Sequence, residues 1–234
     1  MVINVLASSS EGNAYTISDG CTTILLECGL PIHELKLKMD FKLPHACIVS
    51  HSHGDHAKSV RNLYRLGIPL YMSRQTAEEV TGGDKVMVFG IHSLRHLHRV
   101  EVGTFSVLPL EMNHDAYCLG FVLLSNVLNE SVFFATDTCY IPYKLPAVDY
   151  IMVEANYDDD VLNQRIADGH LPLVMKNRLL QSHMEIGTTI KWLKMQKMDR
   201  AKRIYLLHLS GGSSNADEFK RRVMEATGIP TTIA

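Results

Sequence analysis

The chain has 234 residues, of which 46% are hydrophobic, and its formal net charge is -2 at pH 7. A chain of this length and apolar content buries a substantial core, so we expect one domain over residues 1–234. The near-neutral balance of charge excludes a global basic field, so any polyanionic partner must be held by local patches of Lys and Arg.

Short apolar runs between turn signals predict strands along much of the chain. Runs rich in β-branched and aromatic residues that stop at polar residues are typical of strands. In chain order, the predicted strands cover residues 3–8, 14–18, 22–28, 46–50, 103–112, 118–125, 131–137, 149–155 and 203–209.

Helical patterns lie between these runs. They cover residues 57–67, 73–83, 158–166, 173–182, 188–198 and 216–226. The second of them begins at Ser73, a good N-cap, and stops at Gly82, a good C-terminal residue. Strands come first, and helices then alternate with further strands. This order predicts an α/β fold in which helices cover sheets.

The cysteines and the first residues indicate the compartment. The chain has five cysteines, and no two of them are spaced as C-x-x-C, which favours reduced thiols. The start, MVINVLASSS, lacks the positive n-region and the apolar run of a signal peptide. No segment approaches the ~20 apolar residues that span a bilayer. We therefore expect a cytoplasmic protein without a membrane partner, and the sequence leaves its oligomeric state open.

A dense group of ionisable residues follows the predicted strand at residues 46–50. The stretch HSHGDH supplies three imidazoles and a carboxylate, from His51, His53, Asp55 and His56. Imidazole nitrogen and carboxylate oxygen are the usual ligands of Zn²⁺ and also suit Mn²⁺. An H-x-H pair on an extended chain can direct both rings at one ion, and the pair across the turn can serve a second ion. We interpret Gly54 as the residue that permits this tight backbone. The alternative is a loop of polar surface residues.

Three more residues of ligand type stand directly after apolar runs, where a strand opens onto a rim. They are His114, Asp137 and His208. A lone histidine at such a position is most often a hydrogen-bonded structural residue. Three such positions in a chain that already carries HSHGDH favour metal binding instead.

The order H-x-H-x-D-H, then His, Asp and His, resembles the metallo-β-lactamase fold. That resemblance implies an αββα four-layer sandwich with two mixed sheets and a metal site along one edge. Shorter motifs resemble one branch of the fold, the YycJ/WalJ-like hydrolases. These motifs are SSSEGN, LLECGL, HDA, TDT, an E-x-N element and HLS.

The resemblance implies two divalent ions, Zn²⁺ or Mn²⁺, and a division of their ligands. His51, His53 and His114 would bind one ion. Asp55, His56 and His208 would bind the other, and Asp137 would bridge them. The chain departs from the branch at Glu27, where an Asp is usual, and at SHMEIG, where a Gly-His-Leu-Ser-Asn type of sequence is usual. Neither departure removes an expected ligand.

The resemblance also implies a mechanism. A hydroxide bridging two ions ~3.5–4 Å apart would attack the substrate, and Asp55 would orient it. RNase J and the β-CASP nucleases carry an extra His before the last metal ligand and an acidic residue that steadies it. His183 and Glu154 occur in this order, so His183 would protonate the leaving 3′ oxygen and Glu154 would raise the pKa of His183. The alternatives are a surface histidine and a glutamate that caps the following helix.

Three polar residues are candidates for substrate binding. Ser9 and Asn13, in SSSEGN, offer groups to a phosphate near the metals, although a plain β-turn explains that motif equally well. Asn215, after HLS, lies where a helix N-terminus would hold a phosphate, although helix capping alone explains it.

Together these features predict a two-metal phosphodiesterase or exonuclease whose partner is nucleic acid, with DNA as the expected polymer, or a nucleotide. The first alternative is a small-molecule metallohydrolase on the same fold, such as a cyclic-nucleotide phosphodiesterase or a thioester hydrolase. The second is a non-catalytic binding protein that has kept the fold, which the full set of ligands argues against. Fold alone does not separate these functions.

Overall fold

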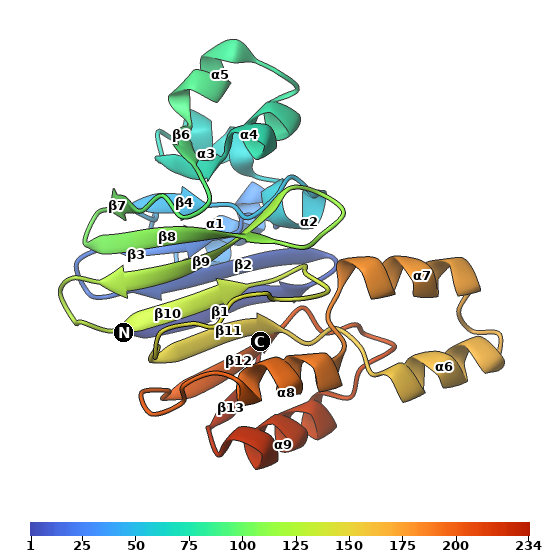
Figure 1. The fold of residues 1–234 in the computed structure, drawn as a ribbon. Helices are drawn as coiled ribbons and strands as arrows, with labels where there is room; N and C mark the ends of the chain where they lie inside the picture. The colour runs from blue at the N-terminus through green and yellow to red at the C-terminus, as the bar shows by residue number, and fades with distance from the viewer. The chain divides into compact units, whose positions relative to one another are not determined.

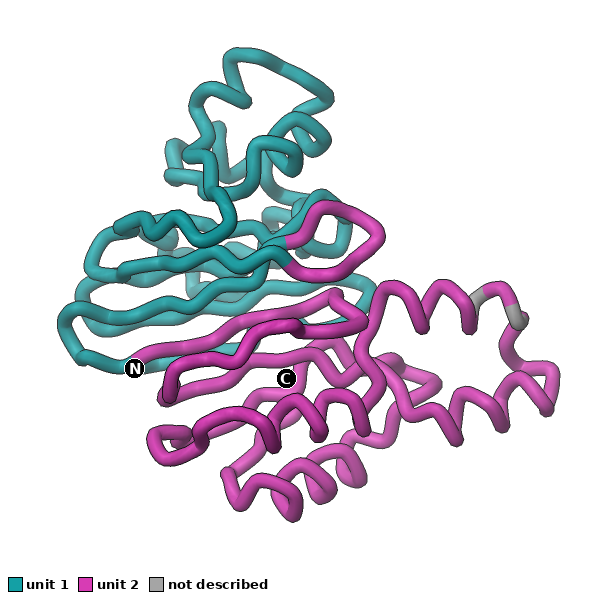
Figure 2. The backbone as a smooth tube through the Cα atoms, in the orientation of Figure 1, with its two compact units in different colours: residues 1–111, 119–130 teal, residues 112–118, 131–234 magenta. Residues whose placement is uncertain are grey.

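The computed structural model describes residues 1–172, 174 and 176–234, and the chain divides into two compact units (Figure 2). The first unit contains Met1–Glu111 and Leu119–Glu130, and the second contains Met112–Cys118 and Ser131–Ala234. The short segment that carries His114 therefore belongs to the second unit, although the chain on both sides of it belongs to the first. The expected single domain over residues 1–234 stays a prediction.

The first unit contains a six-stranded mixed sheet with the strands in sequence order. Its strands are β1 (Val2–Ser9), β2 (Gly12–Ser18), β3 (Thr23–Leu26), β4 (Ala46–Ile48), β5 (Leu70–Ser73) and β6 (His92–Leu94). The first three pair antiparallel, and β3 to β6 pair parallel. Strands β3, β4 and β5 are mostly buried, as expected for parallel strands that read as continuous apolar runs, whereas His92 and Ser93 of β6 are exposed.

Helices and three further strands complete the first unit. They are α1 (Ile32–Lys38), α2 (Gly54–Ala57), α3 (Val60–Arg65), α4 (Arg74–Thr81), α5 (Lys85–Gly90), β7 (Val100–Val102), β8 (Phe105–Met112) and β9 (Cys118–Ser125), the last two reaching the second unit by one residue each. The predicted caps of α4 are confirmed. The Ser73 hydroxyl accepts a hydrogen bond from the Thr76 backbone N–H, and Gly82 is left-handed with φ 59°.

The second unit contains four parallel strands in the order β13-β12-β11-β10. They are β10 (Ser131–Ala135), β11 (Tyr150–Glu154), β12 (Arg203–Leu207) and β13 (Thr231–Ile233), and the helices are α6 (Asp159–Ala167), α7 (Leu173–Ser182), α8 (Ile186–Lys194) and α9 (Ala216–Thr227). Helices α6 and α7 form a hairpin, and α8 packs beside α9 (Figure 1). Because the carboxyl ends of parallel neighbours meet at one sheet edge, residues that follow β10, β11 and β12 come together there.

The predicted α/β class with two mixed sheets is confirmed for the described residues, because the second sheet contains the antiparallel pair β7 and β8 as well as the parallel strands β10 to β13. The strands and helices that the sequence patterns missed are short: β5, β6, β7, β13, α1, α2 and α5. Strands of three or four residues show too little alternation to stand out from a loop. No helix in the described part of the chain is both long and apolar enough to cross a membrane.

Candidate metal centre

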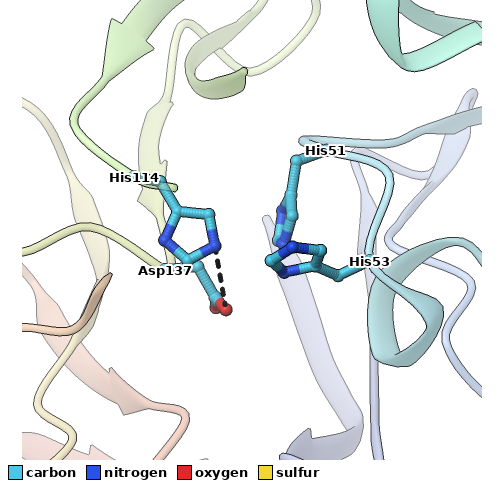
Figure 3. A group of neighbouring side chains, drawn as sticks. All are labelled: His51, His53, His114 and Asp137. Carbon is cyan, nitrogen blue, oxygen red and sulfur yellow. Dashed lines mark ion pairs between the residues drawn. The ribbon is translucent and has the colours of Figure 1, made fainter. Parts of the chain in front are cut away.

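The loop after β4 gathers the imidazoles of HSHGDH within the first unit. His51 and His56 are buried, and their ring centroids are 4.2 Å apart. The ring of His53, the N-cap residue of α2, lies edge-on to that of His51 with centroids 4.6 Å apart (Figure 3). The Asp55 carboxylate lies 3.2 Å from Nε2 of His56. The loop thus concentrates ligand-type atoms as the spacing predicted.

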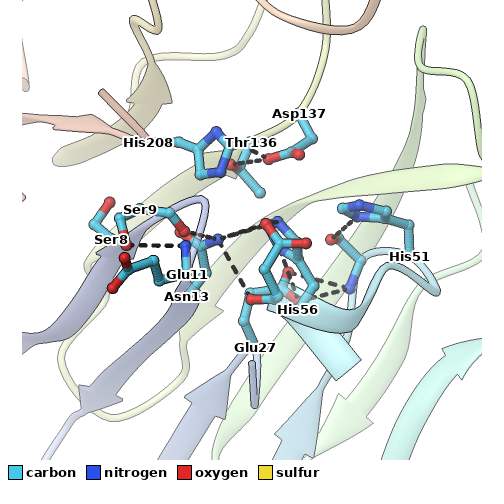
Figure 4. Close-up of polar contacts among 12 residues, drawn as sticks. Ser8, Ser9, Glu11, Asn13, Glu27, His51, His56, Thr136, Asp137 and His208 are labelled. Carbon is cyan, nitrogen blue, oxygen red and sulfur yellow. Dashed lines mark hydrogen bonds and ion pairs between the residues drawn. The ribbon is translucent and has the colours of Figure 1, made fainter. Parts of the chain in front are cut away.

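Buried polar side chains contact the ring nitrogens of His51 and His56 and orient the two rings (Figure 4). The Asn13 amide nitrogen lies 3.1 Å from Nε2 of His56, and Glu27 Oε2 lies 3.5 Å from its Nδ1. The Ser50 hydroxyl lies 2.9 Å from Nδ1 of His51, and its backbone N–H donates to Glu27. Metal-binding histidines typically have one ring nitrogen held by such a partner, which fixes the orientation of the other. Glu27 thus places a carboxylate beside Nδ1 of His56.

The backbone from Glu27 to Gly29 packs closely against the HSHGDH loop. Glu27 is left-handed, with φ 62°, an uncommon conformation for a residue with a Cβ. Its complete burial raises the pKa of its carboxyl, and the neighbouring His56 and Ser50 oppose that rise. At Gly29 a Cβ would lie only 1.6 Å from the Asp55 carbonyl oxygen. The close approach of these two backbones therefore requires glycine at position 29.

The interpretation of Gly54 is wrong. Its φ is not positive, and a Cβ added there would meet nothing within 4 Å. Gly54 is simply the first residue of α2. The glycine on which the HSHGDH loop depends is Gly29, which is distant in the sequence, and no pattern within the loop itself points to it.

In the second unit, His114 is oriented by the backbone. Its Nδ1 lies 3.0 Å from the Ser182 carbonyl oxygen, which accepts the hydrogen bond when Nδ1 carries the proton. Its Nε2 lies 3.9 Å from Asp137 Oδ2 (Figure 3). The same Nε2 lies 3.0 Å from Asp115 Oδ1. In this tautomer Nε2 carries a lone pair and lies close to two carboxylates, and such a set of donor atoms can bind a cation.

A second group of the same unit gathers at the carboxyl ends of β10, β11 and β12. Ligand atoms of Asp137, Glu154, His183 and His208 all lie within 4.8 Å of one another. Asp137 and His208 are left-handed, with φ 49° and 54°, and such backbone strain is typical of functional sites. The Thr136 hydroxyl donates to Asp137 over 2.7 Å (Figure 4), and the Asn156 amide donates to the His208 carbonyl oxygen over 2.7 Å.

Glu154 is the centre of this group. Its Oε1 lies 2.7 Å from Nδ1 of His183 and 3.2 Å from Nδ1 of His208, and its Oε2 accepts from the backbone N–H groups of Thr138 and Met184. Burial opposes ionisation, but the charge of His183 and hydrogen bonds from both histidines lower the pKa of Glu154. The same burial favours neutral His183, but the charge and hydrogen bond of Glu154 raise its pKa.

The donor sets suit divalent ions. In each unit the atoms presented are imidazole nitrogens and carboxylate oxygens, the ligands of Zn²⁺ and Mn²⁺. Partners on the far side of the rings, such as Glu27 and Glu154, complete the usual support of a metal-binding histidine. The predicted roles of all these residues as ligands stay predictions.

The three predicted substrate contacts have structural partners of their own. The Ser9 hydroxyl accepts a hydrogen bond from the Glu11 backbone. Asn13 is fully buried, between the Ser9 carbonyl oxygen and the HSHGDH loop. Asn215 caps α9, because its side-chain oxygen accepts from the Glu218 N–H. A role for any of them in substrate binding stays a prediction.

Sequence reasoning missed several residues that shape the two groups. They are Gly29, Ser50, Asp115, Thr138 and Ser182. Gly29, Asp115 and Thr138 lie within the motifs LLECGL, HDA and TDT, but the motifs by themselves gave these three residues no role. Ser50 and Ser182 are short polar neighbours that carry no distinctive sequence pattern. The EAN element, which begins with Glu154, was the one sequence motif that could have pointed to the residues that orient His208.

Comparison with known proteins places this geometry in a family. A family model described as "Beta-lactamase superfamily domain" matches residues 22–209, which run through both units. None of the curated proteins matches the sequence significantly.

Three solved structures share the fold at low sequence identity. The metallo-β-lactamase fold protein YhfI from Bacillus subtilis is 18% identical, with a TM-score of 0.75 over 99% of this chain and 95% of that one. A diphosphatase from the PhnP family is 16% identical, with a TM-score of 0.71 over 99% and 94%. The short form of human tRNase Z is 15% identical, with a TM-score of 0.63 over 100% and 96%.

Proposed function

The chain belongs to the metallo-β-lactamase superfamily, and on that premise we propose that it is a two-metal phosphodiesterase that cleaves nucleic acid, with DNA as its polymer. The observation that carries the proposal is the pair formed by Glu154 and His183, joined over 2.7 Å. It adds a proton donor to a group of metal-ligand type, and hydrolysis of a phosphodiester with a poor leaving group needs such a donor.

We assign the ligands as the family resemblance implies. One ion would be held by His51, His53 and His114, the other by Asp55, His56 and His208, and Asp137 would serve both. Two divalent ions, when bound, supply a water whose pKa is lowered toward ~7 and neutralise charge on the phosphoryl oxygens. The donor types, the burial of His51, His56, Asp137 and His208, and the carboxylates behind the rings support this assignment.

The chain's own residues would manage the protons. Nδ1 of His183 is engaged by Glu154, so the proton available to a substrate is the one on Nε2. The raised pKa of His183, caused by Glu154, keeps more of the imidazolium form at neutral pH. The His183 side chain is 16% exposed, whereas Glu154 is completely buried. Glu154 therefore acts by holding the ring and not by touching the substrate. Asp55 would orient the attacking water through its carboxylate.

Two of the structural neighbours, a diphosphatase and tRNase Z, act in phosphate chemistry, which agrees with the proposal. The near-neutral charge of the chain favours a second candidate, a phosphodiesterase of small substrates such as cyclic nucleotides. The same metals and the same His183 would serve either substrate, so only the contacts outside the reacting phosphate distinguish them.

A hydrolysis panel tests the proposal. Purified protein loaded with Mn²⁺ or Zn²⁺ is assayed on single-stranded DNA, duplex DNA, RNA, a cyclic nucleotide and bis-(p-nitrophenyl) phosphate. We expect cleavage of DNA and of bis-(p-nitrophenyl) phosphate, both abolished by EDTA. The His33→Ala variant, which changes an exposed histidine of α1, serves as a control and should match the wild type. Turnover of the cyclic nucleotide without cleavage of DNA would replace the leading proposal with the second.

A further inference from the structure

An arginine in the last turn of α6 lies on the loop that follows His208. Nη1 of Arg165 donates to the Ser213 hydroxyl over 3.1 Å. The acid nearest the start of that helix, Asp158, is paired with Arg222 over 2.6 Å. Among the residues that the structure describes, no carboxylate forms an ion pair with Arg165. No carboxylate among these residues neutralises the charge of Arg165.

The guanidinium lies directly against the loop. A Cβ on Gly212 would lie 2.1 Å from Nη1 of Arg165 and 2.7 Å from Cζ, so the guanidinium would have to move if position 212 carried a side chain. The loop is also tied to the candidate centre. The Ser210 N–H donates to the Asn156 carbonyl oxygen over 2.8 Å, and the Asn156 amide donates to the carbonyl oxygen of His208.

We propose that Arg165, on the Gly212 loop, binds a phosphate of the substrate other than the one that is cleaved. This inference rests on the proposed function and names a specificity determinant for it. The guanidinium carries five N–H donors in a planar fork that matches phosphate oxygens, and Ser213 engages only one of its nitrogens. Arg165 forms no hydrogen bond or ion pair with the described residues Asp137, Glu154, His183 and His208, so we expect it to act away from the reacting phosphate.

The distance along the chain sets the reach of this site. Gly212 comes four residues after His208, and an extended chain spans at most ~3.5 Å per residue, so the two lie within about 14 Å of each other. A neighbouring phosphate of a polynucleotide falls in that range, whereas a cyclic nucleotide has only one phosphate. The acids Asp159 and Asp160 lie in the first turn of α6, at the opposite end of the helix from Arg165. Asp168, beyond the last turn, accepts a hydrogen bond from Gln164.

Two variants and one control test the proposal. Arg165→Gln removes the charge, and Gly212→Ala adds a methyl group that displaces the guanidinium without removing it. Arg178→Gln removes one charge from exposed helix α7 and is the matched control. KM and kcat are measured on a short single-stranded oligodeoxynucleotide and on bis-(p-nitrophenyl) phosphate, and metal content is measured for each variant.

We expect Arg165→Gln and Gly212→Ala to raise KM for the oligodeoxynucleotide by about 10-fold to 100-fold, the usual effect of a lost charge-assisted hydrogen bond. The kcat on that substrate, all constants on bis-(p-nitrophenyl) phosphate and the metal content should stay within about twofold of the wild type. Arg178→Gln should change nothing. If both variants lose activity equally on the two substrates, or lose metal, then Arg165 holds the loop and binds no phosphate.

A binding measurement separates this inference from the proposed function. The anisotropy of a fluorescent oligodeoxynucleotide is followed with metal-free wild type and with each variant. Weaker binding by Arg165→Gln than by Arg178→Gln supports the phosphate site even if the wild type hydrolyses neither substrate, a result that overturns only the proposed function. If the wild type hydrolyses the oligodeoxynucleotide, and Arg165→Gln has the same KM and the same binding affinity as the wild type, then only the phosphate site is overturned. Absence of both binding and hydrolysis overturns both.

Discussion

Glu154 holds His183 through a hydrogen bond of 2.7 Å between Oε1 and Nδ1, and the carboxylate that makes it is completely buried. The same oxygen lies 3.2 Å from Nδ1 of His208. One carboxylate thus orients both the proposed general acid and a proposed metal ligand. Variants at this pair should therefore separate acid catalysis from metal binding.

Removal of the His183 ring should cost catalysis but not metal. We expect His183→Ala to keep its metal content and to lose DNA cleavage by about 10²–10⁴-fold, the usual contribution of a positioned acid. The loss should be smaller on bis-(p-nitrophenyl) phosphate, because p-nitrophenolate leaves without a proton. Rates on both substrates with elemental analysis check this. Wild-type rates on both would make His183 a structural residue, and loss of metal would make it a ligand.

Glu154→Gln should affect both functions more mildly. An amide still accepts one hydrogen bond but carries no charge, so the pKa of His183 should fall relative to the wild type. The contact with His208 supports a proposed ligand, and loss of such support typically weakens metal binding by 10-fold to 100-fold. Titration with a competing chelator and the pH dependence of kcat measure the two effects. Unchanged metal affinity would show that Glu154 serves His183 alone.

Metal content tests the ligand assignment. We expect about two divalent ions per chain in protein purified without chelator, and one fewer in His53→Ala, because that ring belongs to the group after β4. The exposed His33→Ala variant should keep both ions. Elemental analysis is the measurement. Content near zero in the wild type, not restored by soaking in Zn²⁺ or Mn²⁺, contradicts the assignment.

Salt should distinguish the two substrate classes. Binding of a single strand through Z phosphates releases counterions, so log K falls with log[salt] at a slope of about -0.7Z. Contact with roughly three phosphates gives a slope near -2, whereas a cyclic nucleotide with one phosphate gives a shallow slope. KM measured between low and moderate salt on each substrate checks this. A shallow slope for DNA would indicate that the protein contacts one phosphate only.

Two glycines of the first unit should respond differently to the same change. Gly29→Ala places a Cβ 1.6 Å from the Asp55 carbonyl oxygen, so the HSHGDH loop must move. We expect lost metal, lost activity and a lower melting temperature. Gly54→Ala adds a Cβ that meets nothing within 4 Å, and alanine favours the helix that begins there. It should keep metal and activity. Equal behaviour of the two variants would refute the requirement for glycine at position 29.

Acid should destabilise the first unit through Asp19. Burial opposes ionisation there, but hydrogen bonds from Thr104, Ser125 and two backbone N–H groups lower the pKa of Asp19 from 3.8 to about 2. A carboxyl whose pKa is lower in the folded protein than in the unfolded chain stabilises the folded protein at a pH above its unfolded pKa. This stabilisation is lost as the pH falls toward 2. The shift corresponds to about 2 kcal/mol. Urea unfolding followed by circular dichroism between pH 2 and pH 5 should show a weaker pH dependence in Asp19→Asn than in the wild type. Glu11→Gln, at an exposed site, should retain the wild-type dependence.

Local features could be predicted from the sequence because they depend on near neighbours. Ser73 and Gly82 act on one short helix, so their residue types alone predicted the ends of α4. The ligand-type residues after β4, β10 and β12 were visible because an apolar run that stops at His or Asp marks a strand end. Parallel strands then bring such ends to one edge of a sheet, so Asp137 and His208 meet although most of the second unit lies between them.

The tertiary structure alone determined which side chains orient the proposed ligands and the proposed general acid. Glu154 and His183 are 29 residues apart, and Glu154 and His208 are 54 apart, so the contacts that orient both rings depend on strand order and helix packing. Position 29 requires glycine because the Asp55 backbone lies against it, and the Arg165 side chain lies against Gly212. A glycine in the sequence indicates where the backbone can adopt unusual conformations, but it does not indicate which distant atom will pack against that backbone. Steric exclusion between distant segments is therefore decided by packing in three dimensions, whereas capping and ligand type are properties of the residues themselves.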